Sequence, residues 1–225
     1  GNGQHLLFAA RQRGAFLALA LPQTRKKVIE PLERPSNGRG DLRPAFRQVL
    51  GLRTDLAAAH LSPAFGGRAA YDAFAVRVEA RHAEAKIAGI PLKAKAREVL
   101  EAVAARDVPI ALATSTGTAQ ADALLERTGL RGFFAAVIGG DQVARPRPNP
   151  EIYVRAAEAL GLRAQDCAAF EDSAPGTRAA IAAGCITVQI PDISEPDAGL
   201  RRLGHHIAPD LHLAAIAVRL LPDPL

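Results

Sequence analysis

The chain has 225 residues, of which 48% are hydrophobic and 23% are charged, which is the composition of a globular protein. This composition excludes a disordered tail protein, a collagen-like fibre and a small disulfide scaffold. The net charge of +5 is uneven, because residues 1–50 hold nine Lys and Arg against three Asp and Glu (+6), whereas residues 51–225 hold nineteen against twenty (−1). The two cysteines, Cys167 and Cys185, have apolar neighbours and no CxxC spacing, so we expect buried thiols.

The basic N-terminal part contains one apolar run, AFLALAL, at residues 15–21. Because it follows Arg11 and Arg13, it resembles the hydrophobic part of a secretory signal, but its length is at the short limit for one. No apolar run approaches the ~20 residues of a membrane-spanning helix. We therefore expect a cytoplasmic protein that has no membrane partner.

The rest of the chain has two patterns. Residues 41–88 have helical periodicity without strands, which predicts a helical insert. From about residue 90, short apolar runs alternate with amphipathic Ala- and Leu-rich stretches, which is typical of a parallel sheet built from βα units. The expected strands are 108–114, 133–138, 166–170, 186–190 and 205–208, and the expected helices are 93–106, 120–128, 149–160, 175–183 and 211–221.

Polar residues gather where three of these strands end, which is where parallel sheets bind ligands. The first end, TSTG at 114–117, offers hydroxyls and backbone N–H groups that suit an anion. The second, DQVARPRPNP at 141–150, holds a cation in a proline-stiffened loop, and the third, FEDSAPG at 170–176, holds adjacent carboxylates. Helix caps alone could explain the hydroxyls and acids, but together the three ends also suit Mg²⁺ and a phosphoryl group.

The order and spacing of ALATSTG, GGDQVARPRPNPEIYVRAAEALGL and CAAFEDSAPGTRAAIAAG resemble motifs of the haloacid dehalogenase (HAD) superfamily. The similar branch contains β-phosphoglucomutase-like and phosphoglycolate-phosphatase-like enzymes, and the resemblance covers roughly residues 88–210. It implies an α/β fold in which a Rossmann-like parallel sheet, formed by residues 1–40 and 89–225, is flanked by helices and carries a helical cap at 41–88. The implied activity is a Mg²⁺-dependent phosphatase or phosphomutase acting on a small phosphorylated metabolite.

The resemblance also implies roles for single residues. Thr114, with Ser115 beside it, is similar to the hydroxyl that binds the transferred phosphoryl group. Arg147 stands where the family has a catalytic Lys, so the positive charge is kept but a planar fork replaces an ammonium group. Asp172 resembles the Mg²⁺ ligand, and Glu171 resembles its companion that acts through water.

The family's nucleophile is the first Asp of an Asp-x-Asp motif at the end of the first strand, and this sequence contains no such motif. A strand at 5–8 would put Ala9 and Arg11 at the two Asp positions. A strand at 26–29 would put Glu30 at the nucleophile, as the candidate catalytic carboxylate, and Leu32 at the acid/base. Since neither placement supplies both carboxylates, we expect catalysis to be impaired.

Two further expectations concern function class and partners. The alternative to an impaired enzyme is a non-catalytic binding or scaffold protein that keeps the fold. Nucleic acid is not an expected partner, because the basic N-terminal segment has few aromatic residues and no clear cationic helix face. We expect a monomer or a homodimer.

Overall fold

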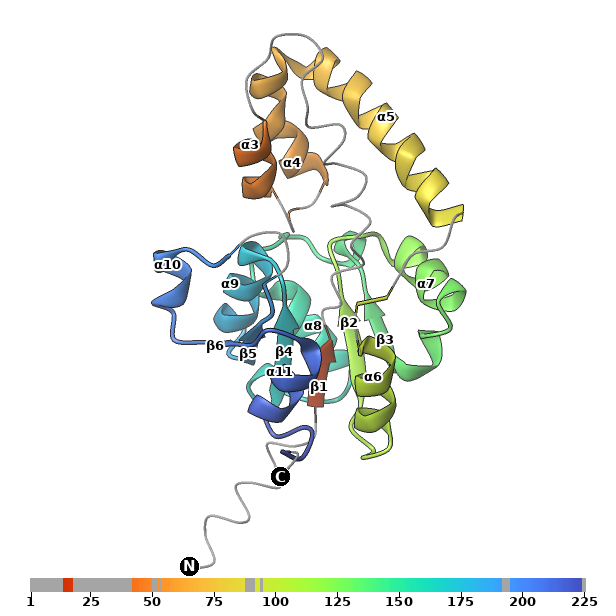
Figure 1. Cartoon of the computed structure of the whole chain (residues 1–225), viewed down its shortest axis with the longest axis vertical. Coiled ribbons are helices and arrows are strands. Elements are labelled where there is room, and N and C mark those ends of the chain that lie inside the picture. The colour runs from red at the N-terminus through yellow and green to blue at the C-terminus, as the bar shows by residue number, and fades with distance from the viewer. Residues whose placement is uncertain are drawn as a thin grey trace, which may run out of the picture. The chain divides into compact units, whose positions relative to one another are not determined.

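The computed structural model describes residues 14–17, 42–49, 52, 54–87, 92–93, 95–191 and 195–223. The chain divides into two compact units (Figure 1), which we describe separately. The sheet unit contains Gly1–Ala20 and Ala94–Leu225, and the helical unit is Leu21–Lys93, within which the predicted 41–88 insert lies. Among the described helices, none has the length and apolar character needed to cross a bilayer.

The sheet unit is built on a parallel sheet, which in the described residues has six strands in the order β3-β2-β1-β4-β5-β6. This is the strand order of a Rossmann fold, so the α/β class predicted from the alternating pattern is confirmed. The strands are β1 Gly14–Leu17, β2 Ile110–Ala113, β3 Ala136–Ile138, β4 Cys167–Glu171, β5 Ile186–Gln189 and β6 His206–Ile207.

In the part of the chain that the structure describes, the first strand is Gly14–Leu17, which lies between β2 and β4. The placements 5–8 and 26–29 that we derived from the sequence lie outside the described residues. In β1, Ala15 pairs with Ile110 of β2 on one side and with Ala168 of β4 on the other. Central strands of parallel sheets are covered on both faces and read as continuous apolar runs, and β1 lies in the AFLALAL region that resembled a signal sequence. The apolar run, rather than a strand that ends at a carboxylate, is the sequence signal of this strand.

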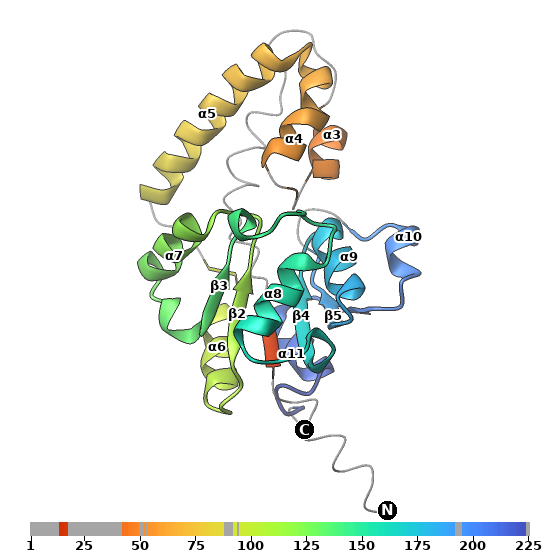
Figure 2. The same ribbon diagram turned by 180° about the vertical axis from the view of Figure 1, so that it is seen from behind.

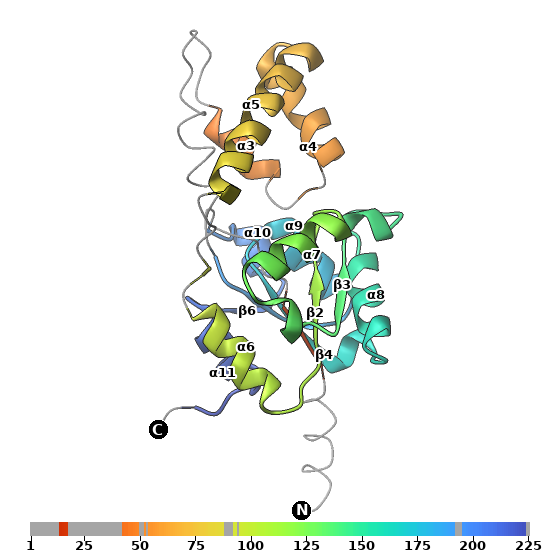
Figure 3. The same cartoon turned by 90° about the vertical axis from the view of Figure 1, so that its right-hand side faces the viewer.

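Helices cover both faces of the sheet (Figure 3). One face packs against α6, α7 and α11, and the other packs against α8 and α9. The helices of this unit are α6 Ala96–Ala104, α7 Thr118–Arg127, α8 Glu151–Ala159, α9 Ala174–Ala182, α10 Ala198–Arg201 and α11 Leu211–Ala217. Short 3-10 turns η2 Arg131–Phe133, η3 Gly140–Gln142 and η4 Ala164–Asp166 join them to the strands.

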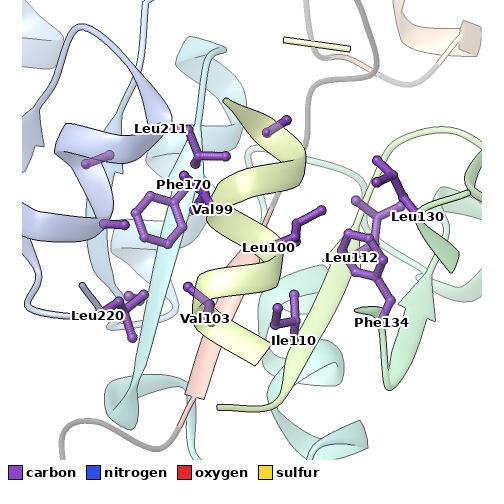
Figure 4. Close-up of a cluster of buried hydrophobic side chains, with 14 of the residues drawn as sticks. Val99, Leu100, Val103, Ile110, Leu112, Leu130, Phe134, Phe170, Leu211 and Leu220 are labelled. Carbon is purple, nitrogen blue, oxygen red and sulfur yellow. The ribbon is translucent and has the colours of Figure 1, made fainter. Parts of the chain in front are cut away.

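The two faces of the sheet differ in side-chain size because successive residues of a strand point to opposite faces. In β2, Ile110 and Leu112 belong to the cluster under α6, whereas Ala111 and Ala113 belong to the cluster under α8. Figure 4 shows the larger side chains of the first cluster, including Phe170 of β4, around Val99 and other residues of α6. We call these the large-residue face and the small-residue face.

Cys167 and Cys185 lie in the cluster of the small-residue face, and both are free and buried, as we expected. Burial, with a smaller contribution from Asp166, raises the pKa of Cys167 to about 12. Burial, together with Cys167, likewise raises the pKa of Cys185 to about 12. Both thiols are therefore protonated at neutral pH and act as small apolar side chains.

The helical unit consists, in its described part, of α3 Arg43–Val49, α4 Thr54–Leu61, η1 Ser62–Phe65 and α5 Arg68–Ile87 (Figure 2). Its core is aromatic: the ring centroids of Phe65 and Phe74 lie 4.6 Å apart, and Phe46 meets Phe65 edge-on at 6.0 Å. Gly66, which ends η1 with a φ of 80°, makes the turn that leads into α5. The unit therefore has a hydrophobic core of its own.

Candidate functional site

The first part of the site lies where β2 ends, at the carboxyl edge of the sheet. Thr114 continues the strand pairing, since its N–H donates to the carbonyl of Ile138 at 3.0 Å, and its side chain is buried. The N–H of Thr116 donates to the Thr114 hydroxyl oxygen at 3.2 Å, which turns the chain towards α7. Ser115 thus lies between the end of a strand and a tight turn, the position at which Rossmann-like folds bind ligands.

The loop after β3 packs directly against this turn. A Cβ added to Gly139 would lie 2.3 Å from the N atom of Thr118, and one added to Gly140 would lie 2.5 Å from the carbonyl oxygen of Ser115. The carboxylate of Asp141 accepts from the N–H of Thr118 at 2.9 Å and from its hydroxyl at 2.7 Å. These bonds, the hydroxyl bond first, hold the pKa of Asp141 below its ordinary value. Asp141 therefore caps α7 from a distant part of the sequence.

The loop that carries Arg147 is fixed from α8. The Glu151 carboxylate, in the first turn of this helix, accepts from the N–H of Ala144 at 2.9 Å and of Arg145 at 3.0 Å. The same two bonds are the largest causes that lower the pKa of Glu151. Asn149 adds a bond to the N–H of Glu151 at 3.1 Å. These hydrogen bonds thus hold in place the loop that carries Arg147.

Arg147 links the strand ends of β2 and β4. Its Nη1 donates to Glu171 Oε1 at 2.5 Å, and its Nε and Nη2 donate to the hydroxyl oxygen of Ser115 at 3.0 and 2.7 Å. Burial opposes the charge of the guanidinium, which is 8% exposed, but Glu171, Tyr153 and Asp172 outweigh it and raise the pKa of Arg147. Arg147 is therefore a permanent buried cation.

Glu171, the last residue of β4, is 2% exposed and bound from three sides. Its Oε1 accepts from Arg147 and also from the hydroxyl of Tyr153 on α8. Its Oε2 accepts from the hydroxyl of Ser173 at 3.0 Å and, more weakly, from the N–H of Ser173 at 3.4 Å. A Cβ on Gly176 would lie 2.1 Å from the Glu171 carboxyl carbon, so the first turn of α9 packs directly onto the carboxylate. Burial and the charge of Glu171 raise the pKa of Tyr153 well above its ordinary value, so Tyr153 is a neutral donor.

Three of the residues predicted for the site, Ser115, Arg147 and Glu171, are joined by hydrogen bonds. Thr114 precedes Ser115 in the chain and Asp172 follows Glu171, so both border this group. Glu30 lies outside the described residues. The proximity is geometric, and the roles that the resemblance implies for these residues stay predictions.

Sequence reasoning missed several of the contacts. The ring of Tyr153 is buried, and its hydroxyl binds Glu171, a bond that the sequence pattern does not indicate. We gave Asp141 no role, because the pattern does not reveal that a residue 23 positions from Thr118 caps its helix. The Ser173 hydroxyl donates to Glu171 and accepts from the N–H of Gly176 at 3.2 Å. Its cap was visible in the sequence, because a serine directly before the first turn of a helix commonly caps it.

Carboxylates are scarce in the segment that follows β1 in the sequence. The residues that follow β1 in the sequence are Ala18, Leu19 and Ala20, and no Asp or Glu precedes Glu30. Among the described residues, no three His, Cys, Asp or Glu side chains gather in a way that could hold a metal ion.

Comparison with known proteins matches this chain to one family. The family model for haloacid dehalogenase-like hydrolases matches residues 10–184. The chain is 38% identical over 119 residues to the plasmid protein CbbY of Cupriavidus necator, which is 51% of this chain and 47% of that protein. It is 38% identical over 82 residues (36% of this chain, 44% of the relative) to the fructose-1-phosphate phosphatase YqaB of Escherichia coli K12. It is 33% identical over 109 residues (44% of this chain, 43% of the relative) to the phosphoglycolate phosphatase of the same organism. The matched part thus spans about half the length of these relatives, or less.

Solved structures agree with the fold over nearly the whole chain. A putative β-phosphoglucomutase from Thermotoga maritima superposes with a TM-score of 0.70 at 24% identity, covering 93% of this chain and all of the other. A HAD family hydrolase from Deinococcus radiodurans, solved with bound phosphate and sodium, superposes with a TM-score of 0.68 at 24% identity, covering 96% of this chain and all of the other. These likenesses establish the fold, and the family model covers more than half of the sequence. The chain belongs to the haloacid dehalogenase-like hydrolase family.

Proposed function

We propose that the chain binds the phosphoryl group of a small phosphorylated metabolite at the carboxyl edge of its sheet. We also propose that its catalytic activity, that of a phosphatase or phosphomutase, is impaired. The observation that carries the proposal is the Ser115–Arg147 contact, which places a hydroxyl and a buried cation side by side beside Thr114. Hydroxyls and a guanidinium fork are the groups that proteins use to bind phosphate oxygens.

The relatives support a small phosphorylated substrate. Two of them are named for phosphatases of fructose 1-phosphate and of phosphoglycolate, and a third, from Thermotoga maritima, is named a phosphorylated carbohydrates phosphatase. By this likeness, we infer that the ligand is a phosphorylated sugar or organic acid. The helical unit would act as a cap that selects the ligand. We further propose a cytoplasmic protein, monomeric or homodimeric, that acts on small molecules rather than on membranes or nucleic acids.

Members of this family usually use Mg²⁺, and the residues of this chain fit that ion poorly. Asp172 would be a ligand, by resemblance, but both oxygens of Glu171 already accept hydrogen bonds from the protein. Mg²⁺ prefers six oxygen ligands in near-octahedral geometry. We therefore derive no step of the reaction through a metal.

The impairment follows from the residues after β1. In the family, carboxylates end the first strand, and here Ala18, Leu19 and Ala20 follow Leu17. An alanine cannot form the acyl phosphate of covalent catalysis, and the remaining groups of the site can only bind and orient the phosphoryl group.

Hydrolysis of p-nitrophenyl phosphate in the presence of Mg²⁺ tests the impairment. We expect turnover far below the roughly 1–10³ s⁻¹ typical of enzymes. The double variant Ala18→Asp/Ala20→Asp restores the spacing of the two absent carboxylates, and we expect it to gain Mg²⁺-dependent turnover that Asp172→Ala removes. Turnover in the enzymatic range by the natural chain, lost in Asp172→Ala, would overturn the proposal.

A second candidate function is a non-catalytic scaffold that binds no phosphate. It is favoured by the internal pairing of Arg147 with Glu171, because the two charges already neutralise each other inside the protein. The melting temperature distinguishes the two. A rise with millimolar inorganic phosphate supports a retained site, and an unchanged value with saturating phosphate supports the scaffold.

A further inference from the structure

The hydrogen-bonding capacity of the Glu171 carboxylate is filled by the protein. A carboxylate offers about four lone-pair sites. Four donors occupy them: Arg147 Nη1 and the Tyr153 hydroxyl on Oε1, and the hydroxyl and N–H of Ser173 on Oε2. A metal ion that bound Glu171 would have to displace at least one of these donors and leave it buried without a partner.

The charge of Glu171 is also neutralised inside the protein. The salt bridge to Arg147 is almost fully shielded from solvent, with side-chain exposures of 9% for Arg147 and 1% for Glu171. Asp172 is the second of the two adjacent carboxylates at the end of β4. A divalent cation prefers several oxygen ligands, and one carboxylate supplies few of them.

A metal-free site would nevertheless keep the charge balance of the complete family site. The two carboxylates that are absent after β1 remove two negative charges relative to the family pattern. One Mg²⁺ that is not bound removes two positive charges, so the two losses cancel. Arg147, Glu171 and Asp172 together carry −1, which is the sum that the family's Lys, four carboxylates and Mg²⁺ would carry.

Arg147 has the geometry to bind an oxyanion directly. Its Nε and Nη2 both donate to the hydroxyl oxygen of Ser115, at 3.0 and 2.7 Å, so the guanidinium is held beside a hydroxyl that could share an anion with it. Three of its five N–H groups donate to described residues, which leaves two for a ligand or for the rest of the chain.

We infer that Arg147, rather than Mg²⁺, supplies the positive charge at this edge of the sheet, so that the chain binds a phosphoryl group without a metal. The inference rests on the phosphate binding proposed above. It assigns Ser115 and Arg147 to the ligand and gives Glu171 the role of holding the guanidinium in place.

Calorimetric titration of the full chain with inorganic phosphate tests the inference, once in EDTA and once in excess Mg²⁺. We expect the two dissociation constants to agree within about two-fold and Mg²⁺ alone to give no binding heat. Binding that appears only with Mg²⁺, or saturable binding of Mg²⁺ alone, overturns the metal-free site and leaves the proposed function intact. Absence of phosphate binding under both conditions refutes the proposed function itself.

Two variants sharpen the result. Arg147→Gln removes the cation, and we expect a folded chain of this variant, checked by circular dichroism, to lose phosphate binding. Because that change can also unfold the protein, Asp172→Asn provides a second measurement that leaves the buried pair intact. Removing one like charge about 4 Å from a phosphate dianion in a watery environment tightens binding by roughly thirty-fold. A metal-dependent site would instead be lost in Asp172→Asn, and that result contradicts the inference.

Discussion

The large-residue and small-residue faces of the sheet use the same strands for different purposes. Under α6, the side chains of Leu112 and Phe170 fill the space between sheet and helix with hydrocarbon. Under α8, alanines such as Ala113 and Ala169 leave room for the ring of Tyr153, which is fully buried. The hydroxyl of this ring binds Glu171, so the small-residue face connects the core to the site.

Alanine-rich packing on the small-residue face therefore makes room for Tyr153, whose hydroxyl binds Glu171. Glu171 follows Ala169 at a spacing of two, on the same face of β4. A long side chain at residue 169 would compete with Tyr153 for that space. We therefore expect substitutions on the large-residue face to change stability alone, and substitutions on the small-residue face to change stability and ligand binding together.

The largest expected effect comes from breaking the buried pair on the small-residue face. Arg147→Met leaves Glu171 as a buried carboxylate without its cation, which typically costs about 3–5 kcal/mol. Urea unfolding of the variant measures the loss. In Arg147→Met/Glu171→Gln the carboxylate charge is absent as well. The double variant should therefore lose clearly less free energy of unfolding than the sum of the losses in the two single variants. Additive losses would show that the two side chains do not depend on each other.

A cavity on the large-residue face has the next largest expected effect. Leu112 is fully buried, and Leu112→Ala should lower the free energy of unfolding by about 2–5 kcal/mol. Leu213, which is 44% exposed on α11, offers a matched control, and Leu213→Ala should change the free energy of unfolding by no more than about 0.5 kcal/mol. The phosphate affinity of the folded Leu112→Ala chain should equal that of the natural protein. A loss of affinity would mean that the two faces are not independent.

Overpacking the small-residue face gives a smaller loss of stability. Ala169 is completely buried, and Ala169→Val adds two methyl groups that the core must accommodate, at about 1–3 kcal/mol. Unlike Leu112→Ala, this variant should also weaken phosphate binding, because the displaced Tyr153 loosens Glu171 and with it Arg147. Calorimetric titration at a temperature where the variant is folded measures that weakening. An unchanged affinity would contradict the connection between core and site.

The sequence predicted most of the sheet unit because hydrophobic periodicity reports which residues are buried. The expected strand 108–114 contains β2, and the expected helix 149–160 contains α8. The first strand escaped detection for a physical reason: a continuous apolar run fits both a buried parallel strand and the hydrophobic part of a signal sequence.

The sequence predicted which residues form the site, but it did not predict the hydrogen bonds between them. The five residues could be named because each ends or follows a strand at the same edge of a parallel sheet: Thr114, Ser115, Arg147, Glu171 and Asp172. That the Arg147 fork would bind Ser115 and Glu171 together depends on side-chain conformations that spacing does not reveal. The cap that Asp141 provides for α7 depends on tertiary contact in the same way.

The smallest expected effect concerns the cap that Asp141 provides for α7. This cap is exposed to solvent, whereas the Arg147–Glu171 pair is buried. The folded pKa of Asp141 is lowered, so its stabilising contribution is complete above its ordinary pKa and is lost as the pH falls below about 4 and through the lowered value. Asp141→Asn should therefore unfold at lower urea than the natural chain at pH 7, and the difference should shrink towards zero as the medium is acidified.

Thr118→Ala distinguishes the cap from a general effect of charge. The Thr118 hydroxyl is the largest cause of the lowered pKa of Asp141, ahead of the N–H of the same residue. Removing the hydroxyl should bring the pKa of Asp141 back towards its ordinary value, and most of the pH dependence that Asp141 contributes should disappear while its charge remains. If the urea midpoint of Thr118→Ala keeps the pH dependence of the natural chain, Asp141 acts through its charge on the whole unit. In that case Asp141, like the Arg147–Glu171 pair, would stabilise the unit mainly through its charge, and its hydrogen bonds to Thr118 would contribute little.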